Sequence, residues 1–225
     1  MKKLVAAMLC LALSLMCAVG LANEKIDPSE LQIGVIMIGD TSDMGFNYSH
    51  LVGLQEMQKN LGIEDHQITI LENVADDSTC ADAISELISN GCNVIIGNSF
   101  GFQTYMYEAA AQHPEVLFCH YSGLLQNDTN FCRFNARNYQ TRYLQGIAAA
   151  MRSESGKIGF VGAFKNAEVN VSLNAYALGA QSVNPDVTVY VKYTNSWYDP
   201  TGERQAAEAL LDQGCDVIAQ HVDTT

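Results

Sequence analysis

The 225-residue sequence predicts an α/β fold made of two doubly wound lobes. The first observation is an internal duplication, because DDSTCADAISELISNGCNVIIG (76–97) and DPTGERQAAEALLDQGCDVIAQ (199–220) align at a constant offset of 123 residues. The second is that QIGVIMIG (32–39) resembles KIGFVGAF (157–164), each near the start of one copy. Repeated strand–helix units bury their apolar strands in a parallel sheet, so each copy is expected to form one lobe.

Each copy has the same order of elements. An apolar strand is followed by a loop and a helix, and then by a second strand, HQITILEN (66–73) in one copy and VTVYVKY (187–193) in the other. The duplicated helix follows, with apolar residues spaced for one face, and ends at Gly91 or Gly214 before a third buried strand. Strands that alternate with helices predict a parallel, Rossmann-like sheet in each lobe.

Residues 1–22 have the composition of a secretory signal peptide. Two lysines precede an apolar run, 4–21, that contains no charge, and small residues near its end suit cleavage after Ala22. A lipid anchor at Cys17 is less favoured, because residues 14–16 are bulkier than lipoprotein signals use. We therefore expect an exported protein that is periplasmic or associated with the cell surface, in preference to one with a transmembrane anchor.

The division into lobes follows from the duplication. The first lobe is expected at 23–153 and the second at 154–225. The segment RSESG (152–156) is polar and ends in glycine, as expected of a connection between domains. We therefore predict that the chain crosses from one lobe to the other there.

The charge balance excludes several kinds of partner. The chain has 25 acidic and 12 basic residues, and two of the basic residues lie in the predicted signal peptide. Such an acidic surface repels phosphate backbones and anionic membranes, so nucleic-acid binding is not expected. The five histidines lack paired ligand spacing and the cysteines form no CxxC motif, so we expect no metal site and no other cofactor.

Five cysteines lie outside the predicted signal peptide, so at least one of them is free or pairs between chains. Cys119 belongs to the strand VLFCHY and Cys132 to NFCRFN, and adjacent strands would bring them within bridging distance. Cys80 and Cys92 flank a helix that holds them too far apart. A Cys119–Cys132 disulfide is the pairing that the sequence predicts.

Two facing lobes would enclose a cleft at the carboxyl ends of their strands, where open α/β sheets bind ligands. The loops expected there are 40–47, 98–101, 197–199 and 221–225, which carry polar or aromatic side chains. The only tryptophan, Trp197, lies in TNSWYDP between a predicted strand and a predicted helix. We expect it to form a rigid wall of the cleft, and not to belong to the core.

Several stretches resemble the basic membrane protein family of exported solute-binding proteins for ABC transporters, which are similar to purine nucleoside receptors. They are GDTSDMGFN (39–47), RFNARNYQTRYLQGIAAA (133–150), LGAQSVNPD (178–186), TNSWYDP (194–200) and AAEALLDQGCDVIAQH (206–221). The resemblance implies a type I periplasmic-binding-protein fold without catalytic activity. It also implies a monomer that closes on a purine nucleoside or nucleobase and delivers it to a transporter permease. Members of this family have longer chains, so the second lobe is expected to be incomplete here.

The resemblance, carried over residue by residue, implies ligand contacts from both lobes. Phe46 would stack on the base and Asn47 would hydrogen-bond it, whereas Asp43 would make a polar contact or brace its loop. The alternatives are structural roles: a core position for Phe46, and helix capping for Asn47 and Ser99. The ligand-binding residues expected in this way are Asp43, Phe46, Asn47, Ser99, Phe100, Trp197, Asp199, His221 and Asp223.

Two other functions compete with this interpretation. The segment GNSFG (97–101) fits the nucleophile motif of a secreted serine hydrolase, with Ser99 followed in the chain by Asp199 and His221. This function is less favoured, because no HGGG-type segment precedes the serine and the duplication places Ser99 and His221 in opposing lobes. The other alternative is a ligand-sensing receptor subunit, which would use the same cleft as a transport protein.

Overall fold

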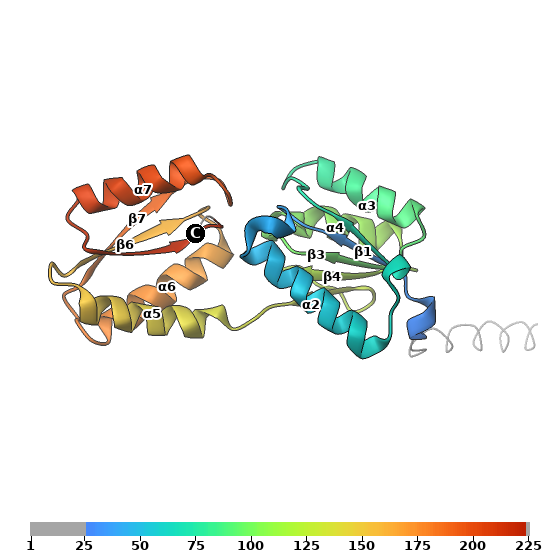
Figure 1. Ribbon diagram of the computed structural model, residues 1–225, viewed down its shortest axis with the longest axis horizontal. Helices are drawn as coiled ribbons and strands as arrows, with labels where there is room; N and C mark the ends of the chain where they lie inside the picture. Colours follow the sequence, from blue (N-terminus) through green and yellow to red (C-terminus); the bar gives the residue numbers. More distant parts are fainter. Residues whose placement is uncertain (1–25, 224–225) are drawn as a thin grey trace, which may run out of the picture.

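The computed structural model describes residues 26–223 as two α/β lobes that lie side by side (Figure 1). The first lobe contains a five-stranded sheet and the second a three-stranded sheet, and every strand pair is parallel. The two doubly wound lobes predicted from the sequence are therefore confirmed. The predicted signal peptide, 1–22, lies outside the described residues, and none of the helices in 26–223 has the length and apolar character needed to cross a membrane.

The sheet of the first lobe has the strand order β2-β1-β3-β4-β5. Its strands are β1 Ile33–Ile36, β2 Ile68–Leu71, β3 Val94–Gly97, β4 Leu117–Tyr121 and β5 Phe131–Phe134. Its α-helices are α2 Phe46–Leu61, α3 Thr79–Ser89 and α4 Gln103–Gln112. From residue 26 onward the lobe also contains the short 3-10 helices η1 Pro28–Glu30, η2 Thr41–Asp43, η3 Asp65–Gln67 and η4 Phe100–Phe102.

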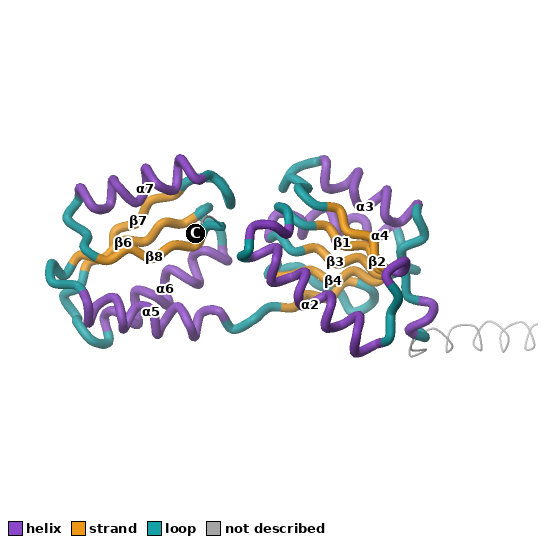
Figure 2. Tube along the Cα trace, in the orientation of Figure 1, coloured by secondary structure: helices purple, strands orange, loops and turns teal. Residues whose placement is uncertain are grey.

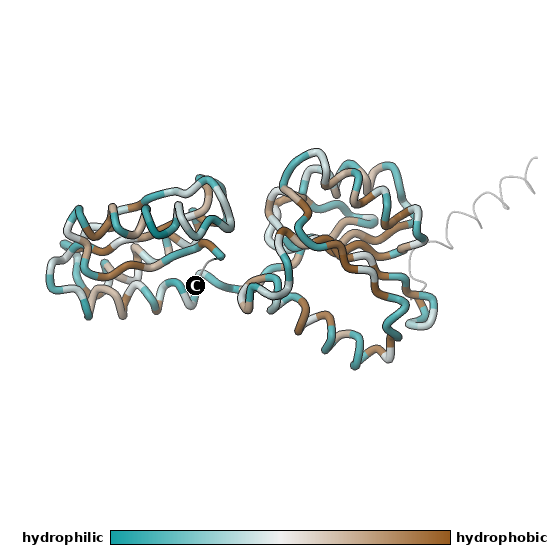
Figure 3. Tube along the Cα trace, turned by 45° about the horizontal axis from the view of Figure 1, so that its top comes forward, coloured by the Kyte–Doolittle hydropathy of each residue, from teal (hydrophilic) through white to brown (hydrophobic). Residues whose placement is uncertain are grey.

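Helices cover both faces of this sheet. Leu87 of α3 and Met106 of α4 pack with Phe118 on one face, and all three side chains are fully buried. Leu54 of α2 packs with Val35 on the opposite face. The strands are apolar along most of their length, whereas the helices alternate between apolar and polar residues (Figure 3). This is the pattern of a sheet that is buried on both faces.

The second lobe has the strand order β7-β6-β8. Its elements are α5 Asn138–Arg152, β6 Lys157–Gly162, α6 Ala167–Gln181, β7 Thr188–Tyr193, α7 Pro200–Asp212 and β8 Val217–His221. Helix α7 lies on one side of the sheet, and α5 and α6 lie on the other (Figure 2). On the α6 side, the Phe160 ring of β6 meets the Tyr176 ring with 5.6 Å between centroids.

The duplication is visible in the packing of the repeated helix on the repeated strand. A Cβ atom added to Gly34 of β1 would lie 2.8 Å from Leu87 Cδ1, and one added to Gly159 of β6 would lie 3.1 Å from Leu210 Cδ1. Leu87 and Leu210 are equivalent at the offset of 123 residues. In both lobes a glycine therefore lets the same leucine of the repeated helix approach the first strand closely.

The chain crosses between the lobes before α5, and not at 152–156 as the sequence suggested. Helix α5 packs against α6, where a Cβ atom on Gly146 would lie only 1.9 Å from the Tyr176 carbonyl oxygen. Residues 135–137 therefore make the crossing between β5 and α5. The segment 152–156 is a surface turn within the second lobe, held by Asp216, which accepts hydrogen bonds from Ser153 Oγ and from two backbone N–H groups. Its polar composition marked a turn and not a domain boundary.

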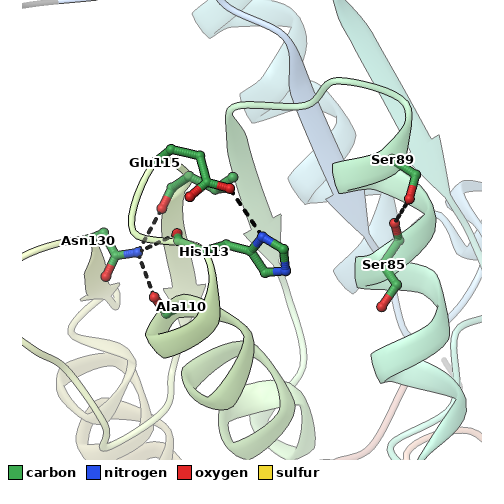
Figure 4. A network of polar contacts seen from close by, with 7 residues as sticks. Ser85, Ser89, Ala110, His113, Glu115 and Asn130 are labelled. Carbon is green, nitrogen blue, oxygen red and sulfur yellow. Dashed lines mark hydrogen bonds and ion pairs between the residues drawn. The ribbon is translucent and has the colours of Figure 1, made fainter.

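The strand that leads into the crossing is anchored by Asn130 (Figure 4). Its Nδ2 atom donates to the carbonyl oxygens of Ala110, His113 and Val116, each at 2.9 Å. The side chain thereby joins the end of α4 to the segment before β4, where the His113 carbonyl also accepts a hydrogen bond from the Val116 N–H. Asn130 directly precedes β5, so it fixes the first-lobe end of the connection.

Cys119 and Cys132 are direct partners in the register of β4 and β5, which confirms the predicted adjacency. Their Sγ atoms lie 3.4 Å apart, and both thiols are free in this structure. The disulfide itself remains a prediction. Cys80, Cys92 and Cys215 are buried, so they are poorly placed to compete for either partner.

We expect the protein recovered from an oxidising compartment to carry one disulfide, Cys119–Cys132, because a small rotation of the two side chains brings the sulfur atoms to bonding distance. Peptide mapping without reduction should yield the cross-linked pair and three alkylated cysteines after unfolding. A map of the same material after reduction is the control. Recovery of Cys119 and Cys132 as alkylated free thiols in the unreduced map would contradict the prediction.

Candidate ligand-binding site

Two adjoining cavities lie between the lobes at the carboxyl ends of both sheets. We name the first the crossing-side cavity, because it includes Asn138, which follows the crossing; its volume is about 450 Å³. The second, the distal cavity, has a volume of about 550 Å³. Ile38 of the first lobe and Trp197 and Asp223 of the second line both cavities. Volumes of this size are typical of sites for small molecules.

The two predicted stacking residues line the same crossing-side cavity, one from each lobe. Phe46, at the start of α2, meets the Tyr121 ring with 5.8 Å between centroids. Trp197, in the loop after β7, packs edge-on against Phe164 at 5.4 Å. Trp197 is half-buried and also packs against the core of the second lobe. Trp197 therefore lies at the cleft, as expected. It also packs against the core, which was not expected.

Asp43 and Asn47 brace the loop after β1. Asp43 accepts hydrogen bonds from the backbone N–H groups of Gly45, Asn47 and Tyr48. Burial opposes ionisation, but these hydrogen bonds together keep the pKa of Asp43 below its ordinary value. Asn47 is buried; its Oδ1 accepts from Asn98 Nδ2 at 2.9 Å and its Nδ2 donates to Asp43. Both line the distal cavity, but their polar atoms already have partners in the protein.

The residues of the hydrolase alternative are not assembled into a triad. The hydroxyl of Ser99 donates to Asp76 Oδ2 at 3.0 Å, and the backbone oxygen of Ser99 lies 2.7 Å from His120 Nε2. Asp199 caps α7 by accepting a hydrogen bond from the Gly202 N–H, and it lines neither of the two cavities. Asp199 was therefore expected in the cleft but lies at a helix start. Ser99 and Phe100 do line the crossing-side cavity.

His221 and Asp223 reach the cleft from the end of β8. Burial lowers the pKa of His221 to about 4, and the nearby Arg142 guanidinium adds to this effect, so the imidazole is neutral at pH 7. Its Nδ1 atom is buried without a hydrogen-bond partner among the described residues. Burial raises the pKa of Asp223 to about 7, assisted by the Asp43 and Glu203 carboxylates. Both residues line the crossing-side cavity.

Asp76, Arg142 and Glu168 also line the cavities, and they were missed in the sequence. Asp76 was within reach, because the 123-residue offset pairs it with Asp199, which was selected. Arg142 and Glu168 lie on α5 and near the start of α6, so they reach the cleft only through the packing of the second lobe. Within residues 26–223, no group of three or more His, Cys, Asp or Glu side chains is placed to hold a metal ion.

Burial raises the pKa of Glu168 to about 7, and the carboxylates of Asp223 and Asp76 raise it further, whereas the nearby Ser122 acts in the opposite direction. The ordinary pKa of this group is 4.5. A raised pKa in the folded state contributes stability that is fully present below pH 4.5 and is lost as the pH rises through about 7. Ionised Glu168 is therefore a destabilising group at alkaline pH.

We expect Glu168→Gln, which imitates the protonated side chain, to change the Tm little at pH 4.5 and to raise it at pH 8.5. Thermal melts across this range would measure the difference between variant and parent. Glu86→Gln, which removes an exposed charge on α3, is the matched control. A difference between Glu168→Gln and its parent that does not change with pH would contradict the prediction.

Comparison with known proteins finds curated relatives with substantial identity. A purine-binding protein of Brucella abortus is 40% identical over 91% of this chain and 56% of its own length. A putative ABC transporter glucose-binding protein of Haloferax volcanii is 38% identical over 84% of this chain and 47% of its own length. The chain therefore spans about half the length of these relatives.

A solved structure of a solute-binding protein of an ABC transporter system from Aeropyrum pernix shares the fold, with a TM-score of 0.75. Its sequence identity is 21%, over 86% of this chain and 55% of that chain. The expected two-lobed type I fold is thereby confirmed. The model of the Bmp family, described as ABC transporter substrate-binding protein PnrA-like, matches residues 30–225. The chain belongs to this family of ABC transporter substrate-binding proteins.

Proposed function

We propose that the chain belongs to an exported protein that captures a purine nucleoside or nucleobase between its lobes and delivers it to a transporter permease. The observation that carries the proposal is the shared cavity of Phe46 and Trp197, which come from opposite lobes. A planar base placed between two aromatic side chains is held by stacking on both faces. Closure of the lobes would bring both rings to the solute at the same moment.

The energetics of such a site suit a purine. Stacking of one base on one aromatic side chain contributes about 1–3 kcal/mol and tolerates different bases. Selection among bases then depends on buried polar groups, because a base that leaves them unpaired is rejected. His221, a residue of the crossing-side cavity, carries one such group, because its buried Nδ1 has no hydrogen-bond partner among the described residues. Arg142 and Glu168 add a cationic donor and a carboxyl group to the same cavity.

The relatives support a small organic solute and leave two chemical classes to distinguish. The Brucella relative is named as purine-binding, and the Haloferax relative as a putative glucose-binding protein. The two aromatic walls favour a planar ring over a sugar ring, because a flat base uses both faces at once. We therefore place the purine class first.

Isothermal titration calorimetry with adenosine, guanosine, adenine and glucose tests the proposal. We expect at least one of the purines to bind about 10-fold more tightly than glucose, because one stacking interaction already supplies that difference. Native mass spectrometry of the protein purified from its host should show a bound molecule of purine mass. Tight binding of glucose, with no heat from the purines, would replace the purine class by the sugar class.

The remaining elements of the proposal concern the setting of the protein. Residues 1–22 have the composition of an export signal, which would place the protein in the periplasm or at the cell surface. Delivery would proceed as in other two-lobed binding proteins, with a monomer closing on its solute and the permease recognising the closed form. Size-exclusion chromatography with light scattering should give the mass of one chain with and without solute.

A further inference from the structure

Contacts between the lobes fall on two opposite sides of the cavities. Beside the crossing, Asn138 Nδ2 of the second lobe donates to the Tyr121 hydroxyl of the first at 2.9 Å. Far from the crossing, Trp197 Nε1 of the second lobe donates to Asp76 Oδ2 of the first at 3.0 Å. Asp76 precedes α3 and Trp197 precedes α7, and both helices lie along the edge of the molecule opposite the crossing (Figure 1).

Asp76 is held firmly by its own lobe. Its Oδ2 atom accepts a hydrogen bond from Ser99 Oγ at 3.0 Å. The fit against Gly101 leaves no space, because a Cβ atom on Gly101 would lie 2.4 Å from Asp76 Cγ. The position of this carboxylate is therefore set before the second lobe contributes its donor.

Trp197 is equally well held by the second lobe. Its ring packs edge-on against Phe164, and its backbone oxygen accepts a hydrogen bond from the Asp223 N–H at 2.8 Å. This packing points the indole N–H toward Asp76. The other carboxylate oxygen of Asp76, Oδ1, is buried without a hydrogen-bond partner among the described residues.

We propose that Asp76 and Trp197 form a latch that holds the lobes closed on the side opposite the crossing, and that Asp76 is a positioning residue for the Trp197 ring. The inference rests on the proposed function, since it assigns the device that sets the orientation of one stacking wall and the population of the closed form. Sequence resemblance had given Asp76 no role and Trp197 only that of a wall.

The location of the latch explains why a single hydrogen bond matters. A rotation of one lobe about the crossing moves the atoms beside the crossing little and the atoms on the far side most. The Asn138–Tyr121 bond can therefore survive opening, whereas the Trp197–Asp76 bond must break. Only a contact that differs between two states shifts the equilibrium between them. The latch has this property, because it forms in the closed state alone.

The first test needs no solute. The protein is labelled with 5-fluorotryptophan, and Trp197→Phe identifies the ¹⁹F resonance of Trp197. Asp76→Ala should shift this resonance and increase the radius of gyration measured by X-ray scattering. Gly101→Ala should do the same, because its methyl group expels the Asp76 carboxylate while both latch residues remain. Asp76→Asn, which keeps an acceptor oxygen, should restore most of the parent signal.

Asp82→Ala is the matched control, because it removes one exposed carboxylate from α3 outside the cavities. It should leave the resonance and the radius of gyration unchanged. An Asp76→Ala protein that is folded by circular dichroism and gives the parent resonance and the parent radius of gyration would overturn the latch.

A double-mutant cycle with adenosine as the probe tests the coupling. Asp76→Ala and Trp197→Phe should each weaken binding by about 10-fold, since each removes the same hydrogen bond to a charged group. The double variant should be no weaker than Trp197→Phe alone, whereas fully additive losses would show that the two residues act separately and would overturn the latch. Guanosine or adenine replaces adenosine in the cycle if the parent protein does not bind adenosine. If the parent binds none of the three, the proposed purine class fails, while the solute-free measurements still decide the latch.

Discussion

Gly179→Ala is expected to lower the free energy of unfolding of the second lobe by about 3 kcal/mol. A Cβ atom on Gly179 of α6 would lie 2.0 Å from the backbone oxygen of Tyr143 on α5. The contact is reciprocal, because a Cβ atom on Gly146 of α5 would lie 1.9 Å from the backbone oxygen of Tyr176 on α6. Backbone atoms cannot rotate away as a side chain can, so the two helices would have to separate.

Separation of α5 from α6 would loosen the core of the second lobe, where Ala149, Ala180 and Tyr176 are buried. Urea denaturation of Gly179→Ala and Gly146→Ala, followed by circular dichroism, measures the loss. Gly53→Ala is the matched control, because Gly53 lies in α2 with no atom near the position of its Cβ. There the same substitution should stabilise the helix by about 1 kcal/mol. Unchanged stability of both interface variants would show that α5 and α6 do not approach so closely.

The repeated pattern of the sequence was sufficient to predict the architecture. Leu87 and Leu210 occupy equivalent positions in the two repeats, and each packs on the glycine of its own first strand. Periodicity and duplication are properties of consecutive residues, so they can be read without the structure. The crossing could not be located in this way, because α5 is amphipathic and its apolar face suits either lobe. Only the fit of Gly146 against α6 decides to which lobe the helix belongs.

The residues that line the candidate cavities were predicted where their positions depend on strand ends and missed where they depend on packing. Phe46, Trp197 and His221 follow or end elements whose positions the sequence indicates, and all three line the crossing-side cavity. Glu168 reaches that cavity from α6 only through the arrangement of the helices in the second lobe. Asp199 was expected to contact the ligand, but its carboxylate caps α7. Local hydrogen bonds decide whether such a polar residue caps a helix or faces the cleft.

Trp197 combines a position that the sequence predicted with contacts that only the structure shows. Its position between a strand and a helix indicated a wall of the cleft, and the structure places it on the walls of both cavities. No pattern in the sequence indicated its packing on the second-lobe core or its hydrogen bond to Asp76. A truncation at this position should therefore affect folding and binding together.

We expect Trp197→Ala to weaken adenosine binding by about 3 kcal/mol, at the upper end of the range for one base–aromatic stack, because the latch bond is lost with the ring. The free energy of unfolding should fall by about 1–2 kcal/mol, less than for a fully buried large side chain, since the ring is only half-buried. Calorimetry and urea denaturation measure the two losses. Phe118→Ala, at a fully buried position outside the cavities, should show the reverse balance, with a larger loss of stability. Trp197→Ala could instead lose as much stability as Phe118→Ala and bind adenosine like the parent. Trp197 would then be a core residue, and of the two proposed stacking residues Phe46 alone would be a wall of the cleft.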